Sequence, residues 1–76
     1  MINLKKRQDI YKIVGLKIKE FRKEKKLTQL ELAEKVDISI SYLSKIEAEN
    51  CMKSFSLDLL QNIAEALEKN IKDFFE

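Results

Sequence analysis

The side chains between residues 39 and 49 would place short hydroxyls and one cation on a single face of a helix. At about 100° per residue, Leu43 and Ile46 define the inward direction of that helix. The residues that then lie on its outward face and flanks are Ile40, Ser41, Tyr42, Ser44 and Lys45. Serine hydroxyls exchange hydrogen bonds with base edges or phosphates, lysine reaches guanine O6 and N7, and an isoleucine methyl contacts a thymine methyl. The pattern fits a helix that enters a nucleic-acid groove, although any solvated helix also presents a polar outer face.

The composition leaves little means for catalysis or metal binding. The 76 residues include no histidine, which is the commonest general acid–base group and metal ligand. A single cysteine, Cys51, cannot form an internal disulfide or a structural zinc site, and we interpret it as an inert loop thiol. The sequence contains no recognisable nucleophile–base pair, metal cluster or phosphate-binding loop. We therefore expect no enzyme, and no bound cofactor, metal or small-molecule ligand.

Length and hydropathy indicate one small helical domain. A chain of 76 residues with 45% hydrophobic content lies in the range of a single globular domain. No apolar run approaches the roughly 20 residues of a membrane helix, and the N-terminus lacks the apolar segment of a signal peptide. The chain has one glycine and no proline, so it has few of the residues that hairpin turns need. This composition favours helices throughout. We expect a cytoplasmic, all-α protein that does not contact a membrane.

The net charge of +2 is divided unevenly along the chain. Residues 1–26 carry ten Lys/Arg and three acids, a balance of +7, whereas residues 27–76 carry five lysines and ten acids, a balance of −5. A basic N-terminal third indicates either an anionic partner or an ordinary solvated face. Residues 1–8 show no helix cap or clear period, and we interpret them as a loose basic arm that precedes the domain at 9–76.

Capping residues mark where the helices begin. Thr28 and Glu31 have the spacing of a capping box. Ser39 and Ser56 are further candidate N-caps, and Asn70 is a weaker one. Together with apolar positions at spacings of three and four, these signals predict five helices at about 9–26, 28–36, 39–49, 56–68 and 70–75.

The second and third of these helices are separated by only Asp37 and Ile38, so they must cross sharply. Ala33 is small and lies where the two helices would approach most closely. Asp37 falls at the turn, where a left-handed conformation is expected, and aspartate tolerates this conformation less easily than glycine. The arrangement is a helix-turn-helix at about 28–49, in which the second helix is presented to the DNA major groove.

The same stretch closely resembles the Cro/phage-repressor (XRE) family of helix-turn-helix proteins. Residues 27–36 read LTQLELAEKV and residues 38–47 read ISISYLSKIE. The family pattern is roughly L-T-Q-x-x-L-A-x-x-x-G-[IV]-S-x-x-x-[IL]-S-x-[IL]-E, and here only its glycine departs, replaced by Asp37. The resemblance extends over about residues 13–75. It implies a five-helix, lambda-repressor-like DNA-binding domain, similar to short regulators such as restriction–modification controller proteins.

The resemblance also implies roles for individual residues. Those that would contact bases are Ile40, Ser41, Ser44 and Lys45. Those that would contact the DNA backbone are Gln29, Ser39, Tyr42, Asn50 and Lys53. The last two lie in a loop that is slightly longer than the family's and lacks its usual glycine. Arg22 and Glu47 match the partners of an ion pair that joins the first and third helices, although the residues alone fit ordinary exposed charges equally well.

The C-terminal residues Ile71, Phe74 and Phe75 form a candidate dimer interface. Two adjacent phenylalanines cannot both face inward from one helix, so one of them is expected to face a partner subunit. A twofold dimer would present two recognition helices about 34 Å apart to a near-palindromic operator. We therefore expect a homodimeric, sequence-specific regulator, a repressor or autoregulator, that binds double-stranded DNA. The alternative, favoured by the acidic residues 27–76, is an antitoxin-like or coactivator-like protein-interaction module of the same fold.

Overall fold

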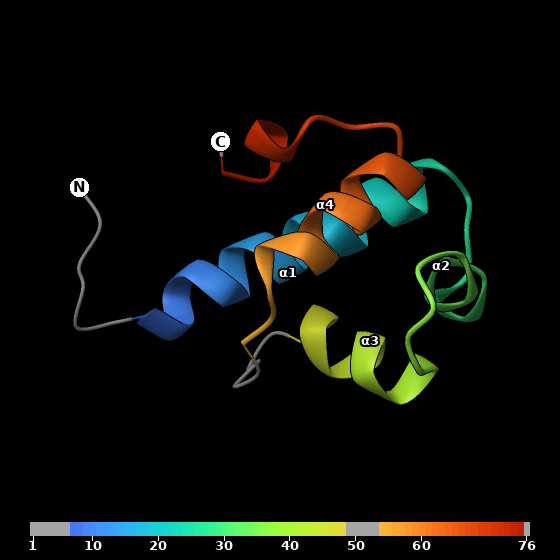
Figure 1. Ribbon diagram of the computed structural model, residues 1–76, viewed down its shortest axis with the longest axis horizontal. Coiled ribbons are helices and arrows are strands. Elements are labelled where there is room, and N and C mark those ends of the chain that lie inside the picture. Colours follow the sequence, from blue (N-terminus) through green and yellow to red (C-terminus); the bar gives the residue numbers. More distant parts are fainter. Residues whose placement is uncertain (1–6, 49–53, 76) are drawn as a thin grey trace.

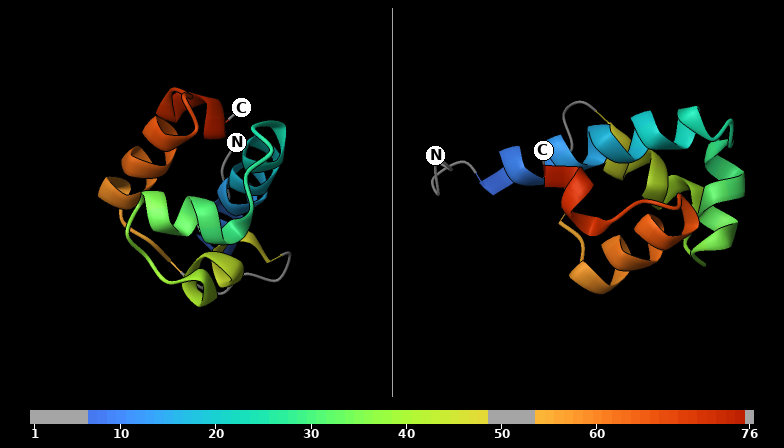
Figure 2. Two further views of the ribbon diagram at one scale, coloured as in Figure 1. Left: turned by 90° about the vertical axis from the view of Figure 1, so that its right-hand side faces the viewer. Right: turned by 90° about the horizontal axis from the view of Figure 1, so that it is seen from above.

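The computed structural model describes residues 7–48 and 54–75, and these residues form helices joined by short turns (Figure 1). The α-helices are α1 (Arg7–Glu24), α2 (Gln29–Lys35), α3 (Ile40–Glu47) and α4 (Leu57–Ala66), and a 3-10 helix, η2 (Ile71–Phe75), follows them. In the left view of Figure 2, η2 and α3 lie on opposite sides of the molecule, with α1 and α4 between them. No helix in the described part of the chain is long and apolar enough to span a membrane.

Each of the three inner α-helices begins directly after its predicted cap. The Thr28 hydroxyl accepts from the Glu31 N–H at 3.0 Å, and the Glu31 carboxylate accepts from the Thr28 N–H at 2.8 Å. The hydroxyls of Ser39 and Ser56 each accept from the backbone N–H three residues later, also at 3.0 Å. These bonds satisfy N–H groups that a helix start leaves without an internal partner. The capping prediction is confirmed at all three starts.

The helices end one or two residues before the predicted positions. The residues Lys26, Asp37 and Glu68 have φ values of 61°, 60° and 59°, which are left-handed. At each of them the N–H bonds to a carbonyl three residues back, and the next N–H bonds to a carbonyl five residues back. This pair of bonds is a Schellman motif, which ends an α-helix. The sequence shows no glycine at these positions, so the helix ends were less visible than the starts.

Of the five expected helices, the described residues form four as α-helices, and the fifth is corrected to a 3-10 helix. η2 has only five residues, too few for several α-helical hydrogen bonds, and 3-10 helices occur in such short pieces. Asp73 stabilises its start by accepting from the Asn70 N–H at 3.0 Å. At the other end of the chain, α1 begins at Arg7, two residues before the expected start, and residues 1–6 of the predicted arm lie outside the described residues.

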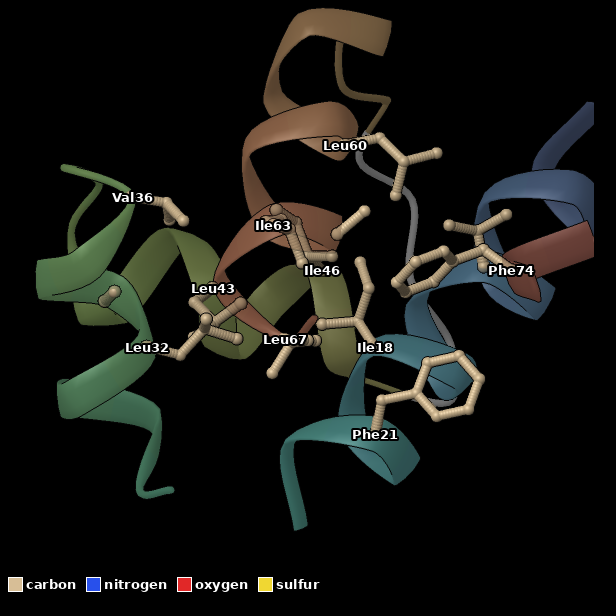
Figure 3. Packing of buried hydrophobic residues seen from close by; sticks show 13 residues of the cluster. Ile18, Phe21, Leu32, Val36, Leu43, Ile46, Leu60, Ile63, Leu67 and Phe74 are labelled. Carbon is tan, nitrogen blue, oxygen red and sulfur yellow. The ribbon is translucent and has the colours of Figure 1, made fainter. Parts of the chain in front are cut away.

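Side chains from every helix meet in one hydrophobic core (Figure 3). α1 contributes Ile18 and Phe21, and η2 contributes Phe74, whose ring meets that of Phe21 edge to face with centroids 5.1 Å apart. The buried hydrophobic residues are Val14, Ile18, Phe21, Leu32, Ala33, Val36, Leu43, Ile46, Leu60, Ile63, Ala64, Leu67 and Phe74. Figure 3 shows α3 entering this core through Leu43 and Ile46. The core therefore fixes the side of α3 that remains free.

Ion pairs join the C-terminal ends of α1 and α4. The Lys69 Nζ lies 3.5 Å from Glu24 Oε1, and the Lys25 ammonium donates to the Glu68 carboxylate. The hydrogen bond from Lys25, reinforced by its positive charge, lowers the pKa of Glu68 below its ordinary value. These pairs lie at the surface, so they contribute less to stability than the core beneath them.

Candidate nucleic-acid interface

The turn between α2 and α3 is closed by backbone hydrogen bonds without a glycine. The Asp37 N–H donates to the Glu34 carbonyl at 3.3 Å, and the Ile38 N–H donates to the Ala33 carbonyl at 3.0 Å. Ile38 packs against the core and Ala33 is almost fully buried. Asp37 has the left-handed conformation that the sequence predicts. This conformation and the two backbone hydrogen bonds set the angle at which α3 leaves α2.

The two faces of α3 differ as the sequence predicts. Leu43 and Ile46 are fully buried. The residues of α3 that are exposed to solvent are Ile40, Ser41, Ser44 and Lys45. This exposed set, which we call the reading face, has two hydroxyls, one ammonium and one branched apolar side chain, and Ile40 is 45% exposed. These groups can donate, accept and make apolar contact, and the shortness of most of them allows a close approach to a surface.

A glycine sets how closely α3 approaches α1. A Cβ atom added to Gly15 would lie 2.1 Å from the backbone carbonyl oxygen of Ile46. Because that oxygen is backbone near the end of α3, it cannot swing aside as a flexible side chain would. Gly15 was not among the residues predicted to matter, although the only glycine of the chain, placed inside a predicted helix, was a usable signal.

Arg22 of α1 and Glu47 of α3 form a bidentate, buried ion pair. The Arg22 Nε donates to Glu47 Oε2 at 2.9 Å, and Nη2 donates to Oε1 at 3.0 Å. The Arg22 Nη1 also donates to the Leu27 carbonyl at 2.6 Å, and the Gln29 amide donates to Glu47 Oε1 at 3.1 Å. With 2% exposure, Glu47 has almost no access to water, so these donors replace its hydration. The network joins α1, the α1–α2 turn, the first residue of α2 and the last residue of α3.

The residues expected to contact the DNA backbone lie around α3 with different degrees of freedom. One N–H of the Gln29 side-chain amide already donates to Glu47, which leaves the second N–H of that amide as a donor for a phosphate. Ser39 uses its hydroxyl oxygen to cap α3. The Tyr42 hydroxyl donates to the Ser54 carbonyl at 3.3 Å, which ties α3 to the start of the next segment. Asn50 and Lys53 lie outside the described residues.

The three residues of the expected dimer interface differ in how deeply they are buried. Phe74 is fully buried in the core, and Ile71 is half-buried against it. Phe75 is 55% exposed and lines an apolar groove of about 310 Å³ together with Tyr11 and Leu57, the latter 70% exposed. Phe74 is therefore the core phenylalanine, and Phe75 is the one available to another molecule.

The chemistry that these residues offer is binding through hydrogen bonds, charge and apolar contact. Within residues 7–48 and 54–75, no group of three or more His, Cys, Asp or Glu side chains could hold a metal ion.

Known proteins with similar sequences and structures are regulators. An immunity repressor protein of Bacillus phage phi105 is 50% identical over 54 residues, which are 71% of this chain and 36% of that protein. The clp gene regulator ClgR from Corynebacterium glutamicum has a structure that matches with a TM-score of 0.80 at 32% identity, covering 87% of this chain and 68% of that one. The biofilm regulator SinR, solved in complex with DNA, matches with a TM-score of 0.74 at 35% identity, covering 83% of this chain and 98% of that one. A SinR protein/SinI protein complex matches with the same TM-score and identity, covering 83% of this chain and 60% of that one.

These matches agree with the expectation that the chain is not an enzyme, because the relatives are regulators. The chain spans about a third to a half of the length of the curated relatives it matches. The helix-turn-helix family HTH_3 matches residues 18–74, which include α2, α3, α4 and most of η2. The chain therefore belongs to this helix-turn-helix family, the group of Cro- and phage-repressor-like proteins that its sequence resembles.

Proposed function

We propose that this protein is a transcriptional regulator that binds a near-palindromic DNA operator as a homodimer, with α3 as its recognition helix. The observation that carries the proposal is the exposed reading face of α3, which is held rigidly from behind by the core and by the Arg22–Glu47 pair. A recognition helix needs a free outer face and a fixed position, and α3 combines the two.

The residues divide into two roles by their position. Ile40, Ser41, Ser44 and Lys45 would read base edges, with Lys45 supplying the charged hydrogen bonds to guanine. Gln29 and Ser39 would position the phosphate backbone, as would Asn50 and Lys53. Tyr42 would do so by exchanging its hydrogen bond to the Ser54 carbonyl for one to a phosphate.

The groove beside Phe75 supports the homodimer. An exposed phenylalanine next to an apolar groove is self-complementary under a twofold axis, since each copy can bury its Phe75 against the other. Leu57, the most exposed large hydrophobic residue among those described, lies on the same groove and would be buried with it. A small domain also gains core from such a partner.

Selection of bound sequences from a random DNA pool, followed by titration of the selected duplex at several salt concentrations, tests the proposal. Specific binding should exceed binding to a scrambled duplex and should weaken as salt rises. Lys45→Ala should weaken binding to the selected duplex by about 1–3 kcal/mol and should relax the base preference at one base pair. Lys72→Ala, a change of equal charge on η2, is the matched control and should have little effect. No preference for any duplex would refute the proposal, and no loss with Lys45→Ala would refute the role of α3.

The dimer is tested separately by sedimentation equilibrium. Phe75→Ser should shift the protein toward the monomer and should abolish cooperative occupation of two half-sites. Leu30→Ser is the control, because Leu30 is 51% exposed on α2 and does not line the groove. Equal behaviour of the two variants would contradict the interface. A protein-interaction module, the alternative function, would show neither operator preference nor steep salt dependence.

A further inference from the structure

We propose that DNA contact continues from α3 onto α1, where Lys12, Lys19 and Lys23 hold the phosphate backbone beside the recognition helix. We call these three residues the α1 stripe. The inference rests on the proposed function, and it assigns a partner to part of the basic N-terminal third, whose charge the reading face does not use.

The α1 stripe occupies one face of α1. Its members are separated by seven and four residues, so they point in nearly the same direction on an α-helix. Lys12 and Lys23 are exposed, and Lys19 is half-buried between them. The distance from Lys12 to Lys23 is eleven residues, or about 16 Å along the helix axis at 1.5 Å per residue.

Contacts of neighbouring residues place this face on the side of α3. Gly15 and Arg22 both contact α3, through the Ile46 carbonyl and the Glu47 carboxylate. Lys19 is four residues after Gly15, and Lys23 directly follows Arg22, which turns the stripe outward from the same edge of α1. Phe21, on a different face, contacts η2 through Phe74. Figure 2 shows η2 and α3 on opposite sides of the molecule, so the edge of α1 that meets α3 is distinct from the face that meets η2. The helical positions of the stripe put it next to the α3 edge.

The lysines on the η2 side and those of the α1 stripe also differ in their ion pairs. Lys17, Lys25 and Lys69 each pair with a glutamate. Lys17 and Lys69 also lie over the ring of Phe21, on the η2 side. Among the described residues, the α1 stripe has no such acidic partner. An uncompensated row of cations beside the reading face attracts an anionic partner and retains its full charge to meet it.

The geometry favours DNA phosphates over other anions. When α3 lies in a major groove, the surfaces next to it face the two sugar–phosphate backbones that border the groove. Phosphates follow one another every 3.4 Å of rise along each strand, so a row about 16 Å long is able to contact more than one of them. Such contacts carry no sequence information, but they raise affinity and fix the register of the recognition helix.

The test compares two double variants that remove the same charge. Lys12→Gln/Lys23→Gln removes two cations of the α1 stripe, whereas Lys17→Gln/Lys72→Gln removes two from the η2 side. The affinity of each full-length variant for a selected operator duplex is measured between low and moderate salt. The slope of log Kobs against log salt should become shallower by about 0.9 for each phosphate that the protein no longer neutralises. The stripe variant lacks two cations per subunit, so the slope should fall by up to about 1.8 for each half-site and up to about 3.6 for a dimer on both half-sites. The control variant should keep the slope of the wild type.

Hydroxyl-radical footprinting gives a second readout. The stripe variant should lose protection at backbone positions that flank the half-site while it keeps the base preference of the wild type. An unchanged slope and footprint in the stripe variant, or an equal change in both variants, would overturn the inference. Absence of operator binding by the wild type would instead refute the proposed function, and melting curves verify that both variants fold.

Discussion

Replacing Arg22 and Glu47 with methionine, singly and together, tests whether the buried ion pair stabilises the domain. Each single change leaves one charge in a site where the side chains of Arg22 and Glu47 are only 9% and 2% exposed. Removing one partner of such a pair costs about 3–5 kcal/mol. A domain of 76 residues is stable by about 4–11 kcal/mol in total, so either single variant should lose a large part of its free energy of unfolding.

The double variant should be more stable than either single variant. Once both charges are gone, no uncompensated charge remains in the site, and apolar side chains of similar volume replace buried pairs at little or no cost. The Gln29 amide loses its bond to Glu47, although half-buried Gln29 retains access to water. The Leu27 carbonyl also no longer receives the Arg22 Nη1 bond of 2.6 Å. Loss of that bond costs about 1–3 kcal/mol. The expected coupling energy is therefore several kcal/mol, larger than that of ordinary contacting residues.

Urea unfolding followed by circular dichroism at low temperature measures all four proteins of this cycle. Single costs that are each below about 1 kcal/mol and simply add would contradict a stabilising buried pair, since that is the behaviour of an exposed surface pair. DNA binding by the folded double variant gives a further comparison. If the pair also positions α3, that variant should bind the operator more weakly even where it is fully folded.

Three further predictions concern single positions. Gly15→Ala should destabilise the fold by about 1–3 kcal/mol, as overpacking does, because its Cβ would meet the Ile46 carbonyl oxygen, and chemical denaturation measures the loss. Asp37→Gly should raise the melting temperature by about 4–8 °C per kcal/mol gained, since glycine adopts the left-handed turn without strain; an unchanged or lower value would contradict this. NMR titration should give Glu68 a pKa below its ordinary value, and Lys25→Met should restore it. Because that pKa is lowered on folding, the stabilisation is present above the unfolded pKa and is lost as pH falls through the folded one.

The helix starts were predictable from the sequence because caps act over three residues. A hydroxyl at Thr28, Ser39 or Ser56 satisfies a backbone N–H three positions later, so the signal and its effect lie in the same short segment. The helix ends were less predictable. Lys26 and Glu68 adopt a conformation that glycine prefers, and only the surrounding hydrogen bonds hold them there.

Contacts between distant residues could not be read from spacing. Arg22 and Glu47 are 25 positions apart, and they were paired in advance only by resemblance to a family. Phe74 and Phe75 are adjacent and identical in type, so their opposite burial depends on how η2 packs against α1. The close approach at Gly15 likewise depends on where α3 crosses α1.

The reading face offers only one charged group and otherwise short side chains. In the proposed function, it therefore requires a helix that is held in a precise position. Most of its hydrogen-bonding groups are serine hydroxyls, which are short and neutral and bond well only within a few tenths of an ångström of about 2.8 Å. Lysine side chains tolerate displacement, but serines cannot reach further if the helix moves. The structure restrains α3 at both ends: Ser39 and the Asp37 turn fix its start, and Gly15 with the Arg22–Glu47 pair fixes its end. In the proposed function, that restraint allows short side chains to discriminate between base pairs, while the cations beside them supply affinity.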